Sequence, residues 1–284
     1  MSKRRTIARE IACEGVALHA GTQVRMLLAP AGPGVGVVFR RSDLDGAQVP
    51  ARYDTVADTT LGTTIASGRA QVAVVEHLMA AIAGAGIDDL VVILDGPEPP
   101  VLDGDALSFL DLLDVAGIKE HEKERQAVKV LRRVEVEHNG ARVALVPAAS
   151  LSFGFEIVFS SAAIGRQTLS LEFTPEAFRR EIAPARTFGD LAQLEALKQI
   201  DRAHGASLLN TLAVDGDRVL NAGMMRFKDE FVRHKILDAV GDMALAGAPL
   251  IARFEGVRSG HALNNAALHA LFADQANYRM VAAA

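Results

Sequence analysis

Residues 78–94, Leu-Met-Ala-Ala-Ile-Ala-Gly-Ala-Gly-Ile-Asp-Asp-Leu-Val-Val-Ile-Leu, decide the fold class because they hold a helix and a strand in direct succession. Residues 78–85 are small and apolar and end among glycines, which predicts a short helix. Residues 90–94 form a continuous apolar run that Asp95-Gly96-Pro97 stops, as expected of a buried strand. Upstream, four short runs bounded by Gly, Pro and Asp predict a mainly antiparallel sheet: residues 24–28, 36–40, 63–66 and 71–75.

The same order, strands and then helices, returns in the second half of the chain. A second helix of the first half is predicted at residues 108–116. In the second half, strands are predicted at residues 128–137, 141–146, 151–159 and 168–173, and helices at 190–202, 229–246 and 264–276. The most polar run, residues 119–125, indicates an interdomain linker or a solvated loop. We therefore expect an α+β fold with an N-terminal domain over residues 1–122 and a C-terminal domain over residues 123–284.

Composition limits the classes of protein that the chain can represent. Half of its 284 residues are hydrophobic and 23% are charged, the proportions of a soluble globular protein. The net charge of −5 excludes a globally basic nucleic-acid binder. A single cysteine excludes a disulfide framework and a cysteine-cluster metal site, and it fits a reducing compartment. Charges follow the basic first residues, and no charge-free apolar run approaches ~18 residues, so we expect a cytoplasmic protein without membrane insertion.

One stripe of the helix predicted at residues 229–246 carries a candidate metal site. His234, Asp238 and Asp242 follow one another at intervals of four and share one face. A histidine and an aspartate one helical turn apart can coordinate a single metal ion. The alternative is that this stripe is the solvent face, since Ile236 and Val240 cover the opposite side.

Two adjacent residues, Glu76 and His77, stand where a strand gives way to a helix. A histidine ligand beside a glutamate suits a hydrolytic zinc site, because one side chain holds the metal and its neighbour takes a proton from the activated water. The alternative is that Glu76 only favours the positive end of the helix and His77 is a core histidine.

Two further segments offer polar groups for a cleft. His261, preceded by glycine at the entry to the last helix, could act as a general acid or stabilise charge, or could be a capping-region residue without a task. Thr187 could donate its hydroxyl to a developing oxyanion, or could satisfy a turn.

Taken in order, these and other blocks resemble one family almost from end to end. The matching blocks are residues 15–21 (GVALHAG), 39–44 (FRRSDL), 58–61 (DTTL), 75–78 (VEHL), 83–88 (AGAGID), 95–98 (DGPE), 103–104 (DG), 185–189 (ARTFG), 226–235 (RFKDEFVRHK), 237–238 (LD), 241–242 (GD) and 259–265 (SGHALNN). The chain resembles the UDP-3-O-acyl-N-acetylglucosamine deacetylases, the zinc enzymes that commit bacteria to lipid A synthesis.

The resemblance implies a fold and a set of roles. It implies two domains of similar α+β topology with the active site between them, and an acyl passage formed by residues of about 189–215. His77, His234 and Asp238 would be the ligands of one catalytic Zn²⁺ per chain, and Glu76 the general base. His261 would be the acid, oriented by Asp242, and Thr187 would help to hold the acetyl carbonyl oxygen. Lys235, Phe188 and Leu61 would contact the substrate, a UDP-linked acylated glucosamine.

Some positions depart from the family's pattern and leave alternatives open. Residues 160–163 (SSAA) stand where His-Pro is usual, and Ala206 and Leu209 replace a glycine and an acidic residue. These departures bear on the substrate groove and the length of acyl chain. A non-catalytic sugar-nucleotide or acyl-binding paralogue and a zinc amidase with another substrate therefore remain as alternatives. We expect a monomer, with no nucleic acid as partner.

Overall fold

Two five-stranded sheets organise the protein; the computed structural model describes residues 2–283, the side chain of Gln193 apart. The first sheet has the order β2-β3-β9-β4-β5 and the second β12-β13-β20-β14-β15. The first comprises β2 (Ile11–Val16), β3 (Gln23–Pro30), β9 (Leu90–Leu94), β4 (Val37–Arg41) and β5 (Ala47–Pro50). The second comprises β12 (Val134–His138), β13 (Ala141–Val146), β20 (Arg253–Val257), β14 (Ser152–Val158) and β15 (Arg166–Glu172).

The two sheets share one topology. In each, the first two strands form an antiparallel pair, and the last strand in sequence lies in the centre, antiparallel to the second strand and parallel to the third. Leu27 is paired with Ile93 in the first sheet, and Leu145 is paired with Phe254 in the second. The expected α+β class with two halves of similar topology is confirmed.

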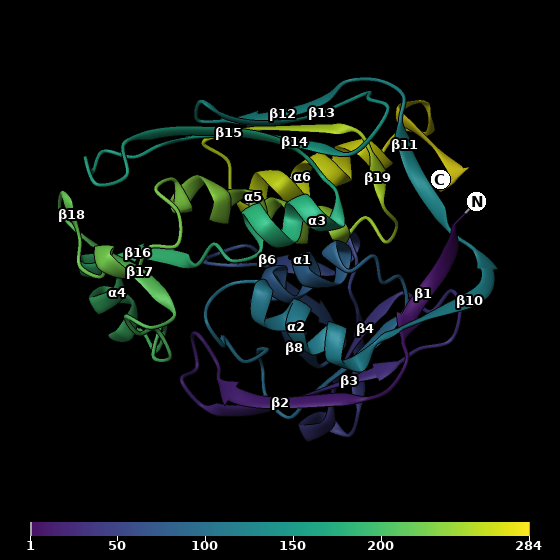
Figure 1. Cartoon of the computed structure of the whole chain (residues 1–284), viewed down its shortest axis with the longest axis horizontal. Helices are drawn as coiled ribbons and strands as arrows, with labels where there is room; N and C mark the ends of the chain where they lie inside the picture. The colour runs from purple at the N-terminus through teal and green to yellow at the C-terminus, as the bar shows by residue number, and fades with distance from the viewer. Residues whose placement is uncertain (1, 284) are drawn as a thin grey trace.

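The helices are α1 (Glu76–Gly84), α2 (Leu107–Ala116), α3 (Pro175–Ala177), α4 (Leu191–Lys198), α5 (Glu230–Ala244) and α6 (His261–Phe272). All helices except α4 lie between the two sheets (Figure 1). In Figure 1, α5 and α6 lie beneath the second sheet, and α1 and α2 lie below them, above β3 and β2. The core is therefore a sheet–helix–helix–sheet stack. Among the described residues, no helix is long and apolar enough to cross a membrane.

Smaller sheets complete the fold. They are β1 (Lys3–Ile7) with β10 (Ile118–Glu124); β6 (Val56–Asp58), β7 (Thr64–Ser67) and β8 (Ala70–Val72); β19 (Leu250–Ile251), β11 (Gln126–Val130) and β21 (Tyr278–Ala282); and β16 (Thr187–Asp190), β17 (Thr211–Asp215) and β18 (Arg218–Val219). Short helical turns lie at η1 (Ser42–Leu44), η2 (Tyr53–Thr55), η3 (Phe178–Ile182), η4 (Ala222–Met224) and η5 (Gln275–Asn277). The β16–α4–β17–β18 unit projects to one side of the stack (Figure 1).

Several predicted boundaries are wrong. Residues 119–125 do not form a solvated loop: residues 118–124 are strand β10, which pairs with β1 through its backbone while its side chains stay largely exposed. The strand predicted at 128–137 is two strands in different sheets, β11 and β12. Helices α1 and α6 each begin two or three residues earlier than predicted, at Glu76 and His261, so both residues belong to a first helical turn.

Helices α1 and α5 approach each other very closely. Gly241 in α5 makes this possible, because a Cβ atom there would lie 2.0 Å from the carbonyl oxygen of Glu76 in α1. Small residues such as Ala80 and Ala81 keep α1 slender, and both are fully buried. The crossing therefore brings the first turn of α1 against the middle of α5, which positions the candidate site.

Candidate metal centre

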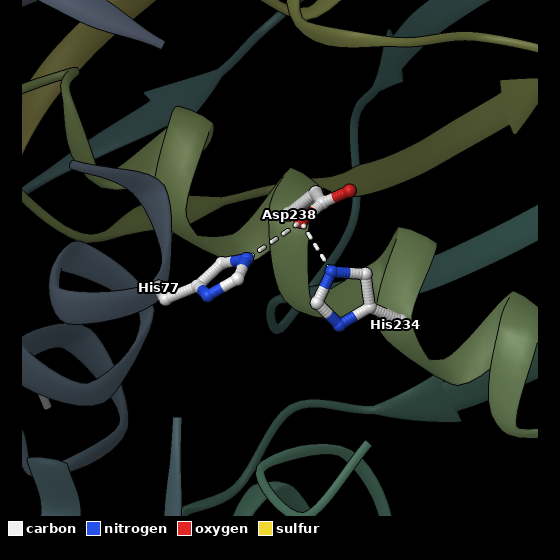
Figure 2. Close-up of side chains that lie close together, drawn as sticks. All are labelled: His77, His234 and Asp238. Atoms are coloured by element: carbon white, nitrogen blue, oxygen red, sulfur yellow. Dashed lines mark ion pairs between the residues drawn. The ribbon is translucent and has the colours of Figure 1, made fainter. Parts of the chain in front are cut away.

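Three potential metal ligands converge at the α1–α5 crossing (Figure 2). His77 projects from α1, and His234 and Asp238 project from α5, with their ligand atoms within 4.8 Å of one another. Asp238 Oδ1 lies 3.3 Å from His234 Nε2 and 3.7 Å from His77 Nε2. All three residues are buried, with at most 5% of their surface exposed, so the helix stripe is not a solvent face.

Hydrogen bonds orient this cluster. His234 Nδ1 donates to the carbonyl of Ala185 at 3.0 Å, because a carbonyl can only accept. Its Nε2 is therefore left to face Asp238. Lys235, expected to contact substrate, lies at the same centre and donates from Nζ to Asp238 Oδ2 at 2.7 Å.

The protonation states suit metal binding. Burial, followed by the neighbouring His234, lowers the pKa of His77 to about 3, and burial also lowers the pKa of His234. Burial works against ionisation of Asp238, but Lys235 and the nearby histidines hold the pKa of its carboxyl below the usual range. Two neutral imidazoles thus face one carboxylate. An unprotonated Nε2 and a carboxylate oxygen 3.3 Å apart are both acceptors, and a cation between them resolves that conflict.

Glu76 lies beside the cluster, in the first turn of α1. It is buried, and its Oε2 accepts a hydrogen bond from the backbone N–H of Thr63 at 2.9 Å. Gly62 crosses directly over it: an added Cβ would lie 3.0 Å from Glu76 Oε1, and the backbone there has φ +152°. Burial raises the pKa of Glu76 to about 7, although His261 opposes this shift. Such a carboxylate can take up a proton near neutral pH.

His261 and Asp242 form a second pair at the site. His261 Nδ1 lies 2.9 Å from Asp242 Oδ2, which also accepts from Asn264 Nδ2 at 2.8 Å. The other oxygen, Oδ1, accepts from the hydroxyl of Thr63 at 2.5 Å. Burial works against the imidazolium, but Asp242 raises the pKa of His261 to about 9. His261 therefore carries a proton at neutral pH and Asp242 holds it in orientation.

A cavity of about 460 Å³ opens over these groups. Glu76, His77, His234, Lys235, Asp238 and His261 line its floor, and Phe159, Ser160, Ser161, Thr187, Phe188 and Leu61 are among its walls. Phe188 packs edge-on against Phe231 and Phe159. Leu61 stands at the rim, 46% exposed, with φ +63°. Every residue proposed from the sequence reaches this cavity except Asp242, which acts from behind His261.

The sequence patterns assign no role to three polar residues of this site. Thr63 bridges Glu76 and Asp242, and Asn264 holds Asp242, although in residues 259–265 the sequence assigns a role to His261 alone. His19 is buried and its Nε2 donates to the carbonyl of Leu61 at 3.2 Å, fixing the loop that carries Thr63. Each acts through hydrogen bonds to residues distant in sequence, and no spacing rule reveals such a contact.

The fold and this site together define a class of protein: an α+β protein of two like halves with a candidate His-His-Asp metal centre between them. Catalytic zinc sites in general have three protein ligands, whereas structural sites are closed by a fourth.

Comparison with known proteins gives the family. A profile of the UDP-3-O-acyl N-acetylglycosamine deacetylases matches residues 4–273. Proteins named UDP-3-O-acyl-N-acetylglucosamine deacetylase are similar: that of Phenylobacterium zucineum is 45% identical over 91% of this chain and 89% of its own length. Those of Aliarcobacter butzleri and Myxococcus xanthus are 40% and 42% identical, over 98% and 99% of this chain and 93% and 90% of theirs. The chain belongs to the UDP-3-O-acyl-N-acetylglucosamine deacetylase family.

Proposed function

We propose that the protein hydrolyses the N-acetyl group of UDP-3-O-(3-hydroxyacyl)-N-acetylglucosamine, a step of lipid A biosynthesis, and releases acetate. The observation that carries this proposal is the buried His77–His234–Asp238 cluster with Glu76 beside it, at the floor of a 460 Å³ cavity. The substrate comes from the names of the relatives, which span nearly the whole chain.

One Zn²⁺ per chain is the metal that we propose. His77 and His234 would supply imidazole nitrogens and Asp238 a carboxylate oxygen, a donor set that zinc accepts. When bound, zinc would polarise the acetyl carbonyl and lower the pKa of a water molecule in the site.

The chain's own residues would move the protons. A carboxylate oxygen of Glu76 takes a proton from the water molecule while the oxygen of that water forms a bond to the acetyl carbon. The Thr187 hydroxyl and the protonated His261 donate hydrogen bonds to the carbonyl oxygen as it becomes negative. The C–N bond then breaks, and the sugar nitrogen takes a proton from His261 or Glu76 as acetate leaves. Asp242 keeps the His261 ring oriented through Nδ1, which leaves Nε2 for the cavity.

Substrate contacts are assigned by place. Lys235, Phe188 and Leu61 line the cavity and would contact the sugar nucleotide and its acyl chain. Gly189, Asp190 and Val214, from the β16–α4–β17 unit, line its far wall, so residues of about 189–215 would form the acyl passage.

We also place the domain boundary at residues 122–123, within β10. All the residues of the centre come from one chain, which supports an active monomer, and the single cysteine supports a cytoplasmic location.

The test is to measure zinc per chain and acetate release in wild-type protein and in His77→Ala and Asp238→Ala variants. About one zinc per chain, lost together with activity in both variants, is expected. A Glu76→Gln variant should retain its zinc and lose about 10²- to 10⁴-fold in kcat. Stoichiometric zinc without acetate release would refute the substrate, and a folded protein without zinc would favour a non-catalytic binding protein.

A further inference from the structure

A second cavity, of about 290 Å³, lies between the two halves and shares no lining residue with the candidate site. It occupies the opposite end of the α1–α5 pair. Met79, Ile82 and Ala83 of α1 and Val240, Met243 and Ala244 of α5 form part of its wall. The metal centre uses earlier residues of both helices, so the two cavities lie on either side of the crossing.

The wall of this cavity is almost entirely apolar. The first half adds Val37 and Ile87, and the second adds Leu151, Phe153 and Phe173. Among the described residues that line it, only Asp88 and Arg125 have polar side chains. Water finds too few partners in such a space, whereas dry apolar cavities of this kind bind apolar molecules. Its volume lies near the lower end of small-molecule sites, which excludes a protein segment as thick as a helix.

The two polar residues give the cavity a charge preference. Both carboxylate oxygens of Asp88 are used within the protein: Oδ1 accepts from Arg125 Nε at 2.8 Å and Oδ2 from the backbone N–H of Arg5 at 2.9 Å. The terminal Nη groups of Arg125 make no hydrogen bond to residues 2–283. A guanidinium held by its Nε and open at its far edge presents donors suited to a carboxylate.

We propose that this cavity binds a medium-length alkyl chain that carries a terminal carboxylate. The chain lies against the apolar wall, and the carboxylate accepts hydrogen bonds from the Nη groups of Arg125. This inference does not depend on the proposed function, because none of the cavity's residues belongs to the candidate site.

Methionine methyl groups allow a test in the unaltered, metal-loaded protein. Met79 and Met243 line the cavity, whereas Met26 is buried elsewhere in the first half and Met280 is exposed. Decanoate, kept below its micelle concentration, is titrated into protein labelled with ¹³C at the methionine methyls. The resonances of Met79 and Met243 should shift together and saturate with one dissociation constant, while those of Met26 and Met280 stay in place.

Variants separate this cavity from binding elsewhere. Ala244→Leu, which adds a side chain inside the cavity, should abolish the shifts, and Ala196→Leu, on the exposed face of α4, should preserve them. Arg125→Gln should weaken decanoate about tenfold and leave decanol unchanged. If Ala244→Leu does not fold, the wild-type titration still decides. The proposal would be overturned if the Met79 and Met243 resonances stayed in place while decanoate saturated a different site. It would also be overturned if decanoate shifted these resonances in Ala244→Leu as much as in the wild type. Equal binding of the acid by Arg125→Gln would overturn the role of the guanidinium.

Discussion

The substitution Gly241→Ala tests the geometry of the α1–α5 crossing most directly. The new Cβ would lie 2.0 Å from the Glu76 carbonyl oxygen, whereas ordinary contact starts at 3.4 Å, so the helices must separate by the difference, about 1.4 Å. In a helix interior, Ala is otherwise favoured over Gly by about 1 kcal/mol. A loss of stability in Gly241→Ala would therefore occur in spite of the higher helix propensity of alanine.

We expect two effects of this separation. Overpacking should lower the free energy of unfolding by about 1–3 kcal/mol. The movement displaces Glu76 and His77 relative to His234 and Asp238, and a misplacement of about 1 Å can cost about 10²-fold in rate. Denaturant titration, zinc content and kcat/KM for acetate release measure these outcomes.

The matched control is Gly223→Ala, because nothing lies within 4 Å of a Cβ added at that residue. It should leave stability and activity close to those of the wild type. If Gly241→Ala were as stable and as active as the wild type, the reasoning from close helix approach would be refuted.

Three further predictions concern charge and hydrogen bonding. Activity should rise as Glu76 loses its proton near pH 7 and fall as His261 loses its proton near pH 9. In Asp242→Asn the alkaline limb of the pH–kcat/KM profile should move to lower pH. An unmoved limb would contradict the pairing of His261 with Asp242. Thr63→Val removes the hydroxyl donor to Asp242, and a bond to a charged group is worth about 1.5–3 kcal/mol, so kcat/KM should fall about tenfold or more while Thr63→Ser stays near wild type. The third prediction concerns Asp89. Burial works against its ionisation, but hydrogen bonds from Arg4 and from backbone N–H groups hold the pKa of its carboxyl below the usual value. The stability from this pair is therefore present above about pH 4 and lost as pH falls through the depressed pKa. In denaturant titrations at pH 7, Asp89→Asn should lower the free energy of unfolding by about 3 kcal/mol. The difference from the wild type should narrow as the pH falls. A difference independent of pH would count against the Arg4–Asp89 ion pair.

The sequence was most informative where a short-range rule applies. The interval of four between His234, Asp238 and Asp242 predicts one helix face, and all three side chains lie on one buried face of α5. Spacing within a helix cannot say that His77 completes the cluster, because that depends on how α1 crosses α5. Only the resemblance to a family joined the two segments in advance.

The misassigned strand β10 shows where local rules fail. Its composition, Lys-Glu-His-Glu-Lys-Glu within residues 119–124, indicates solvent, and its side chains are largely exposed. It is a strand because its backbone pairs with β1, and Arg5 forms an ion pair with Glu120 across the two strands. A tertiary partner therefore overrides the weak local preference. Thr63 and Asn264 escaped notice for a related reason, since their partner Asp242 lies far away in sequence.

The division of the three proposed ligand residues between the halves has a thermodynamic consequence. His77 belongs to the first half, and His234 and Asp238 belong to the second, so the binding of an ion by all three requires both halves to be folded and docked. Binding of the proposed zinc is thus linked to docking, and free metal at about 1,000 times its dissociation constant would stabilise the docked form by about 4 kcal/mol. The melting temperature of this protein should accordingly track the metal supply, and chelation should loosen the contact between the halves before either sheet unfolds.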